Sequence, residues 1–121
     1  MVFVGAGFGA LGRYWLGSKI QSVIGGNVPW GTLTVNASGS LLIGIAMAAF
    51  LSRNLSEDWR LFFVTGVLGG YTTFSAFSFE TLDLMRAKLY GLAAGYVAAS
   101  LILSFLMCWI GSLIGNAAFK A

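Results

Sequence analysis

Four long runs of mostly apolar residues constrain the fold of this chain more than any other feature. They cover roughly residues 1–22, 31–52, 59–85 and 90–115. A helix needs about 20 mostly apolar residues to cross a bilayer, and each run is long enough to do so. The runs are continuously apolar and do not alternate, so a transmembrane β-barrel fits poorly. The sequence therefore predicts an all-α integral membrane protein with four transmembrane helices.

The composition excludes several classes of protein. Of the 121 residues, 58% are hydrophobic and only 9% are charged, which is more apolar surface than a soluble domain of this size can bury. Histidine is absent and Cys108 is the single cysteine, so a Cys/His nucleophile pair, a zinc site and an intrachain disulfide are excluded. The net charge of +3 is too small to indicate nucleic acid. We expect a single membrane domain over residues 1–121 that is not an enzyme.

The third run contains the segment GGYTTFSAFSFE, residues 69–80, which weakens a helix in mid-membrane. Glycine costs about 1 kcal/mol in a helix interior, and threonine is only a fair helix former. A break frees backbone N–H and C=O groups, which the membrane tolerates only where protein, water or an ion satisfies them. Freed carbonyls suit a small cation, and the N-terminus of a half-helix suits an anion. We expect the third helix to be broken mid-span; a merely kinked helix is the alternative.

Uncharged polar side chains form two stripes at four-residue spacing, which places each stripe on one helix face. The stripes are Thr32, Asn36 and Ser40 in the second run, and Tyr96, Ser100 and Ser104 in the fourth. All of these groups donate hydrogen bonds, and neither run contains a carboxylate that could neutralise a cation. The alternative is that each hydroxyl bonds its own helix backbone. Asn36 is the strongest candidate, because its amide is the costliest to bury.

Two phenylalanines in the third run, Phe74 and Phe77, lie three residues apart and so on the same side of one helical turn. An aromatic ring has a positive edge and a negative face. Ring edges that line a narrow passage favour a small anion; packing against lipid or neighbouring helices is the alternative for both rings.

Lysine and arginine in the loops set membrane orientation. One side carries Arg53, Arg60 and Lys120, and the other carries Lys19, Arg86 and Lys88. This balance, three against three, permits insertion in both orientations and pairing of two opposed copies. Small residues at four-residue spacing, such as Gly5 with Gly9 and Gly91 with Gly95, suit close helix packing inside one chain or against a partner.

Three charged residues lie in or beside the apolar runs. Arg13 either lines an aqueous vestibule or extends to a nearby interface. Glu80 and Asp83 lie near the end of the third run, where we expect them to pair with Arg86 or Lys88.

Three motifs in the same order resemble the Fluc fluoride channels, also called CrcB proteins. They are GALGRYWLG in the first run, GTLTVNASGSLLIG in the second and GGYTTFSAF in the third. The resemblance covers nearly the whole chain and is weakest in the fourth run. It implies a multi-pass protein of the bacterial plasma membrane that works as an antiparallel, dual-topology homodimer. Such a dimer has two pores, through which fluoride leaves the cell passively.

The resemblance also implies roles for particular residues. The fluoride pathway is implied to comprise Asn36, Phe74, Phe77, Ser75, Ser78, Tyr96, Ser100 and Ser104. Arg13 is expected near the vestibule. A structural sodium ion at the centre of the dimer is expected to bind the backbone carbonyls of Gly69 and Thr72.

The chain departs from the family pattern at two positions: Tyr71 stands where Leu or Phe is expected, and Ala76 where Thr or Ser is usual. Two other functions remain as alternatives. A small multidrug or cation antiporter needs a carboxylate in the first span, and that run contains Arg13 and no Asp or Glu. A membrane accessory subunit without transport activity is the other.

Overall fold

The computed structural model describes residues 1–119, and these form an all-α bundle. The elements are α1 (Val2–Ile24), α2 (Trp30–Arg53), α3 (Glu57–Arg60), the π-helix η1 (Leu61–Leu68), α4 (Gly69–Tyr71), α5 (Phe74–Arg86) and α6 (Tyr90–Ala118). The elements α3, η1 and α4 follow one another without interruption and form the first half of one long segment, of which α5 is the second half. The four predicted runs therefore correspond to four helical segments, of which the third is broken.

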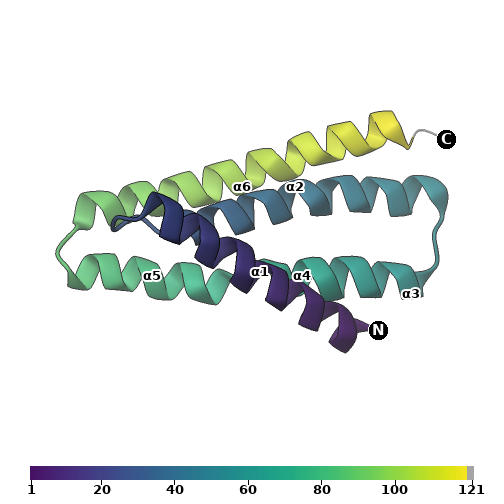
Figure 1. The fold of residues 1–121 in the computed structure, drawn as a ribbon. Coiled ribbons are helices and arrows are strands. Elements are labelled where there is room, and N and C mark those ends of the chain that lie inside the picture. The colour runs from purple at the N-terminus through teal and green to yellow at the C-terminus, as the bar shows by residue number, and fades with distance from the viewer. Residues whose placement is uncertain (120–121) are drawn as a thin grey trace.

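The segments run back and forth between the two ends of the bundle (Figure 1). The connections α1–α2 and α5–α6 lie at one end, while the α2–α3 connection and both labelled chain ends lie at the other. The helices α2 and α6 pack along each other, and α1 crosses obliquely over the broken segment formed by η1, α4 and α5. This alternation is the arrangement expected of four membrane crossings.

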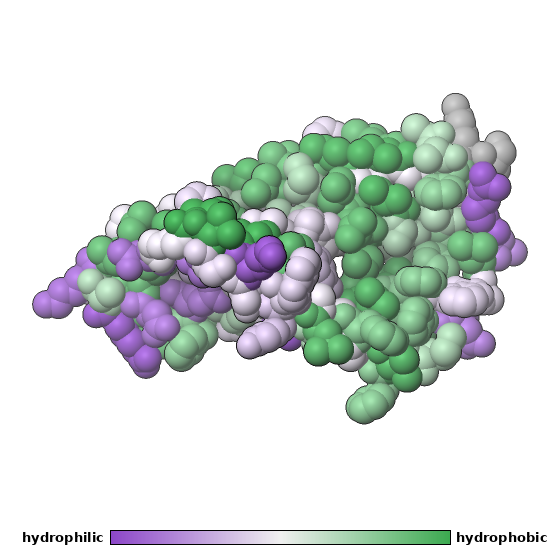
Figure 2. Space-filling model, in the orientation of Figure 1, coloured by the Kyte–Doolittle hydropathy of each residue, from purple (hydrophilic) through white to green (hydrophobic). Residues whose placement is uncertain are grey.

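The surface is that of a membrane protein. Large apolar side chains are exposed on every long helix, for example Phe3 at 90%, Leu51 at 78% and Phe105 at 74%. Apolar residues dominate the middle of the face drawn in Figure 2, and hydrophilic residues gather toward its two ends. Within residues 1–119, three segments are long and apolar enough to cross a membrane by length and composition: Trp30–Arg53, Glu57–Arg86 and Tyr90–Ala118.

The helix α1 is long enough to cross a bilayer but less apolar than the other three segments. Its 23 residues extend about 35 Å at 1.5 Å per residue. Arg13, Lys19 and several glycines lower its apolar content. Because α1 packs on the broken segment, Arg13 finds a partner there in the Gly70 carbonyl, whereas Gln21 bonds Val28 and Gly31 at the start of α2.

Glycines bring the helices into backbone contact. A Cβ at Gly9 of α1 would lie 1.9 Å from the Val67 carbonyl oxygen, and one at Gly5 would lie 2.4 Å from the Phe62 carbonyl oxygen. Between α2 and α6, a Cβ at Gly111 would lie 2.2 Å from the Leu41 carbonyl oxygen. Most of the small-residue spacing is thus explained by packing inside one chain. Gly91 and Gly95 are different, since they are exposed and a Cβ at either would meet nothing within 4 Å.

The break in the third segment is confirmed, but two threonines form it. Thr72 (φ −88°, ψ 156°) and Thr73 (φ −150°, ψ 118°) have extended backbone between α4 and α5. Gly69 and Gly70, which we expected to loosen the helix, remain helical in α4. Gly70 serves close packing instead, because a Cβ there would lie 2.4 Å from the carbonyl oxygen of Ala6 in α1.

Candidate functional site

The side-chain amide of Asn36 holds the break through two hydrogen bonds to one residue. Its Nδ2 donates to the Thr73 carbonyl at 2.9 Å, and its Oδ1 accepts from the Thr73 N–H at 2.7 Å. Asn36 lies on α2, so this member of the polar stripe of the second run faces the break directly. The Asn36 amide has a second N–H, which leaves one donor beyond those that the Thr73 contact uses.

These contacts change which backbone carbonyls are available at the break. In a continuous helix the Thr73 N–H would donate to the Gly69 carbonyl, and the Ala76 N–H to the Thr72 carbonyl. Here the Thr73 N–H donates to Asn36, and the Ala76 N–H donates to the Thr73 hydroxyl at 3.2 Å. The carbonyls of Gly69 and Thr72 therefore lose their helical donors and become available as oxygen ligands.

Arg13 engages the carbonyl of a residue that lies between those two. Its Nε donates to the Gly70 carbonyl at 3.1 Å, across 57 residues of sequence. The half-buried guanidinium thus reaches from α1 to the last turn before the break. A cation beside the final carbonyls of a helix is favourable, because those carbonyls form the negative end of the helix dipole.

Tyr71 fastens the same turn to α2. Its hydroxyl lies 2.9 Å from the Ser38 hydroxyl, and Ser38 in turn donates to the Val35 carbonyl at 3.1 Å. Since Ser38 has only one hydroxyl proton, Tyr71 is the donor in their pair. A Cβ at Gly39 would lie 3.1 Å from the Tyr71 ring, so α2 and Tyr71 pack closely at this point. No pattern in the sequence indicated the pairing of Tyr71 with Ser38.

A pocket of about 300 Å³, here called the phenylalanine pocket, lies beside the break. Its lining residues come from α2, η1, the break, α5 and α6: Asn36, Gly39, Ser40, Ile43, Leu68, Thr72, Phe74, Phe77, Ser100, Leu101 and Ser104. Uncharged hydrogen-bonding groups and two aromatic rings therefore share one hollow, and none of its lining residues is charged.

The two rings of this pocket differ in burial. The Phe74 and Phe77 rings have centroids 5.4 Å apart and planes inclined by 51°. Phe77 is buried and also lies 5.3 Å from the Tyr96 ring, whereas Phe74 is 72% exposed. One wall of the phenylalanine pocket is thus fixed by packing, and the wall at Phe74 is open.

Two buried hydroxyls near these rings have no protein partner. The Tyr96 hydroxyl and the Ser100 Oγ are enclosed, and within residues 1–119 neither makes a hydrogen bond. Tyr96 is 3% exposed and Ser100 is 6% exposed. A buried hydroxyl without a partner is costly, so this face of α6 holds donors that are available to a ligand or to water.

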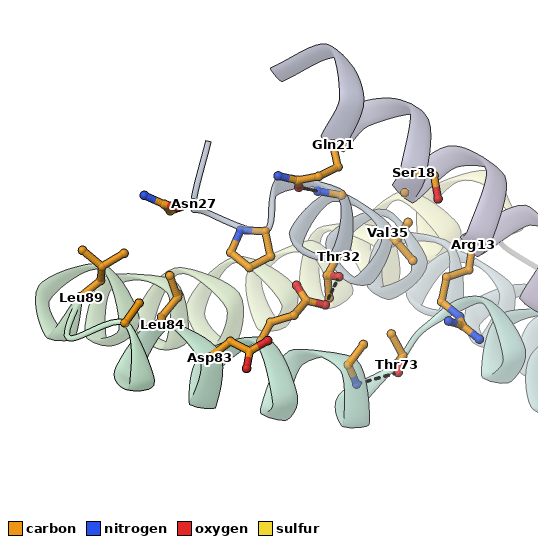
Figure 3. A pocket seen from close by; sticks show the side chains of 16 residues that line it. Arg13, Ser18, Gln21, Asn27, Thr32, Val35, Thr73, Asp83, Leu84 and Leu89 are labelled. Carbon is orange, nitrogen blue, oxygen red and sulfur yellow. Dashed lines mark hydrogen bonds between the residues drawn. The ribbon is translucent and has the colours of Figure 1, made fainter. Parts of the chain in front are cut away.

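A second hollow of about 530 Å³, here called the wide pocket, also reaches the break, where Thr73 lines it (Figure 3). Arg13 points into this region from α1, while Thr32 and Thr73 line it from α2 and from the break. Glu80 and Asp83 of α5 also line it. The wide pocket is more polar than the phenylalanine pocket and contains charges of both signs.

The prediction for the two carboxylates was half right. Asp83 forms an ion pair with Arg86 at 3.9 Å, as expected. Glu80 pairs with neither Arg86 nor Lys88, since its Oε1 accepts a 2.6 Å hydrogen bond from the Thr32 hydroxyl of α2. Glu80 lies one turn after Ala76 on the inward face of α5, and this orientation sets its partner.

The structure gathers most, but not all, of the predicted pathway residues. Asn36, Phe74, Phe77, Ser100 and Ser104 line the phenylalanine pocket, and Tyr96 packs on Phe77. Ser75 and Ser78 are exposed on α5 and do not line that pocket. The Ser75 hydroxyl lies 3.1 Å from that of Thr73, and Ser78 donates to the Phe74 carbonyl at 3.0 Å. A role in transport for these residues stays a prediction.

Side-chain ligands do not form a metal site in the described part of the chain. Within residues 1–119, no group of three or more His, Cys, Asp or Glu side chains could hold a metal ion. A cation bound at the break would therefore depend on backbone carbonyls, of which Gly69 and Thr72 are the two released by the diverted donors.

Known proteins resemble this chain over nearly its whole length. The family described as "CrcB-like protein, Camphor Resistance (CrcB)" matches residues 1–112. A "Fluoride-specific ion channel FluC" from Thermus thermophilus is 44% identical, with 97% of this chain and 92% of the relative covered. A protein of the same name from Agrobacterium fabrum is 42% identical, with 98% of this chain and 96% of the relative covered. Another from Rhodospirillum rubrum is 47% identical, with 95% of this chain and 90% of the relative covered. The chain is a multi-pass membrane protein of a bacterial type, and it belongs to the CrcB-like family.

Proposed function

We propose that this protein is a fluoride-selective channel through which fluoride leaves the cell passively, relieving fluoride toxicity. The observation that carries the proposal is the phenylalanine pocket, where uncharged donors and two aromatic rings meet at the helix break. The relatives that this chain resembles are named fluoride-specific ion channels. The protein is accordingly a transport protein and not an enzyme.

The chemistry of the phenylalanine pocket suits a small, strongly hydrated anion. A pore must replace much of the ion's hydration without trapping the ion. The second N–H of Asn36 and the hydroxyls of Ser100 and Ser104 supply neutral donors, and ring edges of Phe74 and Phe77 add positive potential. The N-terminus of α5 lies at Phe74 and also favours negative charge. The absence of charged lining residues limits trapping.

The wide pocket serves in this proposal as the aqueous vestibule. Arg13 lines it and supplies the positive charge that attracts an anion. Thr32 and Glu80 line this pocket as a hydrogen-bonded pair, and the unpartnered Ser100 hydroxyl of α6 lines the phenylalanine pocket. Ser75 and Ser78, on the exposed side of α5, contribute to the pathway only if a second subunit covers them.

We infer that the working unit is an antiparallel homodimer with two pores. Phe74 is 72% exposed although it lines the pocket, so a second copy is needed to complete the open wall. The balance of loop charges permits insertion in both orientations; Lys120, one of the six residues counted, lies outside the described residues.

A structural sodium ion at the dimer centre fits the donor set of the break. Gly69 and Thr72 of each subunit would hold it through their carbonyls, which are hard, neutral oxygen ligands without helical donors. When bound, the ion supplies positive charge that satisfies these carbonyls in the membrane interior.

The alternatives explain less of the molecule. An antiporter for cationic drugs needs a membrane-embedded carboxylate in α1, and α1 has none. An accessory subunit gives no reason for an uncharged polar pocket or for buried hydroxyls without partners.

Growth on fluoride tests the proposed function in cells. A bacterial strain that lacks its own fluoride exporter should grow at a fluoride concentration that stops the empty-vector control when it expresses this protein. The growth advantage should vanish when sodium chloride replaces sodium fluoride at the same concentration. Equal sensitivity to fluoride with and without the protein, at confirmed membrane expression, would contradict the proposal.

Replacing the aromatic rings tests the pathway. We expect Phe77→Ile and Phe74→Ile each to reduce fluoride efflux from liposomes at least tenfold, because isoleucine removes the ring edge but fills the space. Phe105→Ile is the matched control, because Phe105 is 74% exposed on α6 and lies outside both pockets. Size-exclusion chromatography checks that each variant keeps its assembly. Normal flux in both pocket variants would remove the rings from the mechanism.

A further inference from the structure

We propose that Arg13 is a specificity-determining residue of the cation site at the break, where it excludes divalent cations and leaves the site to monovalent ones. The inference rests on the proposed sodium site and extends it to the choice of ion. It assigns Arg13 a second role besides attracting anions to the vestibule.

The first argument is the position of the guanidinium relative to the proposed ligands. Gly70 immediately follows Gly69 and lies two residues before Thr72, and its carbonyl accepts the 3.1 Å hydrogen bond from Arg13 Nε. The positive charge therefore lies against the short segment that presents both ligand carbonyls. Because Coulomb repulsion scales with the charge of the ion, it is twice as large for Ca²⁺ as for Na⁺ at the same point.

The second argument is the charge of the ligands. Calcium sites use six to eight oxygen ligands, commonly with carboxylates among them. The proposed site has neutral carbonyls, and no metal-binding cluster of acidic side chains exists among residues 1–119. No negative charge of the ligand set offsets the repulsion from Arg13.

The third argument is that Arg13 occupies a carbonyl. The break releases the carbonyls of Gly69 and Thr72, and Arg13 takes the Gly70 carbonyl, which lies between them in the sequence, as a hydrogen-bond acceptor. The bond reduces the number of oxygens available to an ion. Removal of Arg13 thus frees an oxygen and removes a charge, and both changes favour a divalent cation.

The experiment measures the thermal stability of the purified full-length protein against added cation. Detergent-solubilised protein is freed of sodium in a choline buffer and titrated with NaCl, CaCl₂ or MgCl₂ at constant ionic strength. We expect the wild-type melting temperature to rise with Na⁺ and to stay unchanged with Ca²⁺. Ligand binding to the folded state raises stability in this concentration-dependent way.

The neutral variants Arg13→Gln and Arg13→Met should acquire stabilisation by Ca²⁺. The Ca²⁺ concentration at the midpoint of their rise in melting temperature should be at least tenfold lower than that of any rise in the wild type. Arg13→Lys keeps the charge and is the matched control, which should remain insensitive to Ca²⁺. Stabilisation of the wild type by Ca²⁺ as strongly as by Na⁺ overturns the inference. So does a folded neutral variant that still ignores Ca²⁺.

Fluoride efflux from liposomes, recorded with the same preparations, separates this inference from the proposed function. A wild-type protein that releases fluoride but shows no cation-dependent melting temperature leaves the channel intact and eliminates the cation site, and with it the role of Arg13. A protein with cation-dependent stability but no fluoride release contradicts the channel instead.

Discussion

Replacing Asn36 by leucine is expected to lower fluoride flux at least a hundredfold. The substitution removes both hydrogen bonds to Thr73, at 2.7 and 2.9 Å, and also removes a donor from the phenylalanine pocket. The Thr73 N–H and carbonyl would be left without these partners at membrane depth, at a cost of about 1–3 kcal/mol for each group. Liposome efflux measured with a fluoride electrode gives the flux, and melting temperature gives the stability.

Asn36→Asp separates the structural contribution from the contribution to transport. A carboxylate still accepts from the Thr73 N–H but cannot donate to the anion, and its negative charge repels fluoride. We expect Asn36→Asp to retain more of the wild-type melting temperature than Asn36→Leu while losing comparable flux. Wild-type flux in both variants would show that Asn36 takes no part in conduction.

Replacing Gly9 by alanine is expected to produce the largest loss of stability from a single methyl group. The added Cβ would lie 1.9 Å from the Val67 carbonyl oxygen and 2.8 Å from the Tyr71 backbone nitrogen. Both neighbours are backbone atoms, so α1 must move away from η1 and α4. Overpacking costs about 1–3 kcal/mol or more, which lowers the melting temperature by roughly 10 °C for a domain of this size.

Gly7→Ala is the matched control for this prediction. Gly7 lies on the same helix, and a Cβ there would meet nothing within 4 Å. The same substitution should therefore leave the melting temperature unchanged or slightly higher, because alanine favours helix. Equal melting temperatures of Gly9→Ala and Gly7→Ala would mean that α1 does not pack on the broken segment as described.

The sequence predicted the parts of the fold that depend on apolar length. Four helical segments were predictable because crossing a bilayer demands long apolar runs, and the runs near residues 31–52 and 59–85 match Trp30–Arg53 and Glu57–Arg86 within three residues. The break was predictable from GGYTT, but its position was not. Glycine is kept within a helix where a neighbouring backbone lies too close to leave room for a side chain. The packing of Gly70 against Ala6 is such a case, and it follows only from the tertiary structure.

The candidate site was predictable where spacing determines which residues share a face. Asn36 with Ser40, and Ser100 with Ser104, line one pocket because residues four apart in a helix point the same way. The partners of Arg13, Glu80 and Tyr71 were not predictable. Those partners are the Gly70 carbonyl, Thr32 and Ser38, which lie 33 to 57 residues away in sequence. Spacing along one helix carries no information about such contacts.

Selective fluoride release from liposomes tests the central claim most directly. Reconstituted protein, with potassium fluoride and potassium chloride inside and valinomycin added to carry the counter-charge, should release fluoride rapidly while chloride stays inside. Electrodes for the two ions, read in the same vesicles, record both time courses. Equal release of the two anions, or release of neither from vesicles shown to contain folded protein, would contradict a pocket built to select the smaller ion.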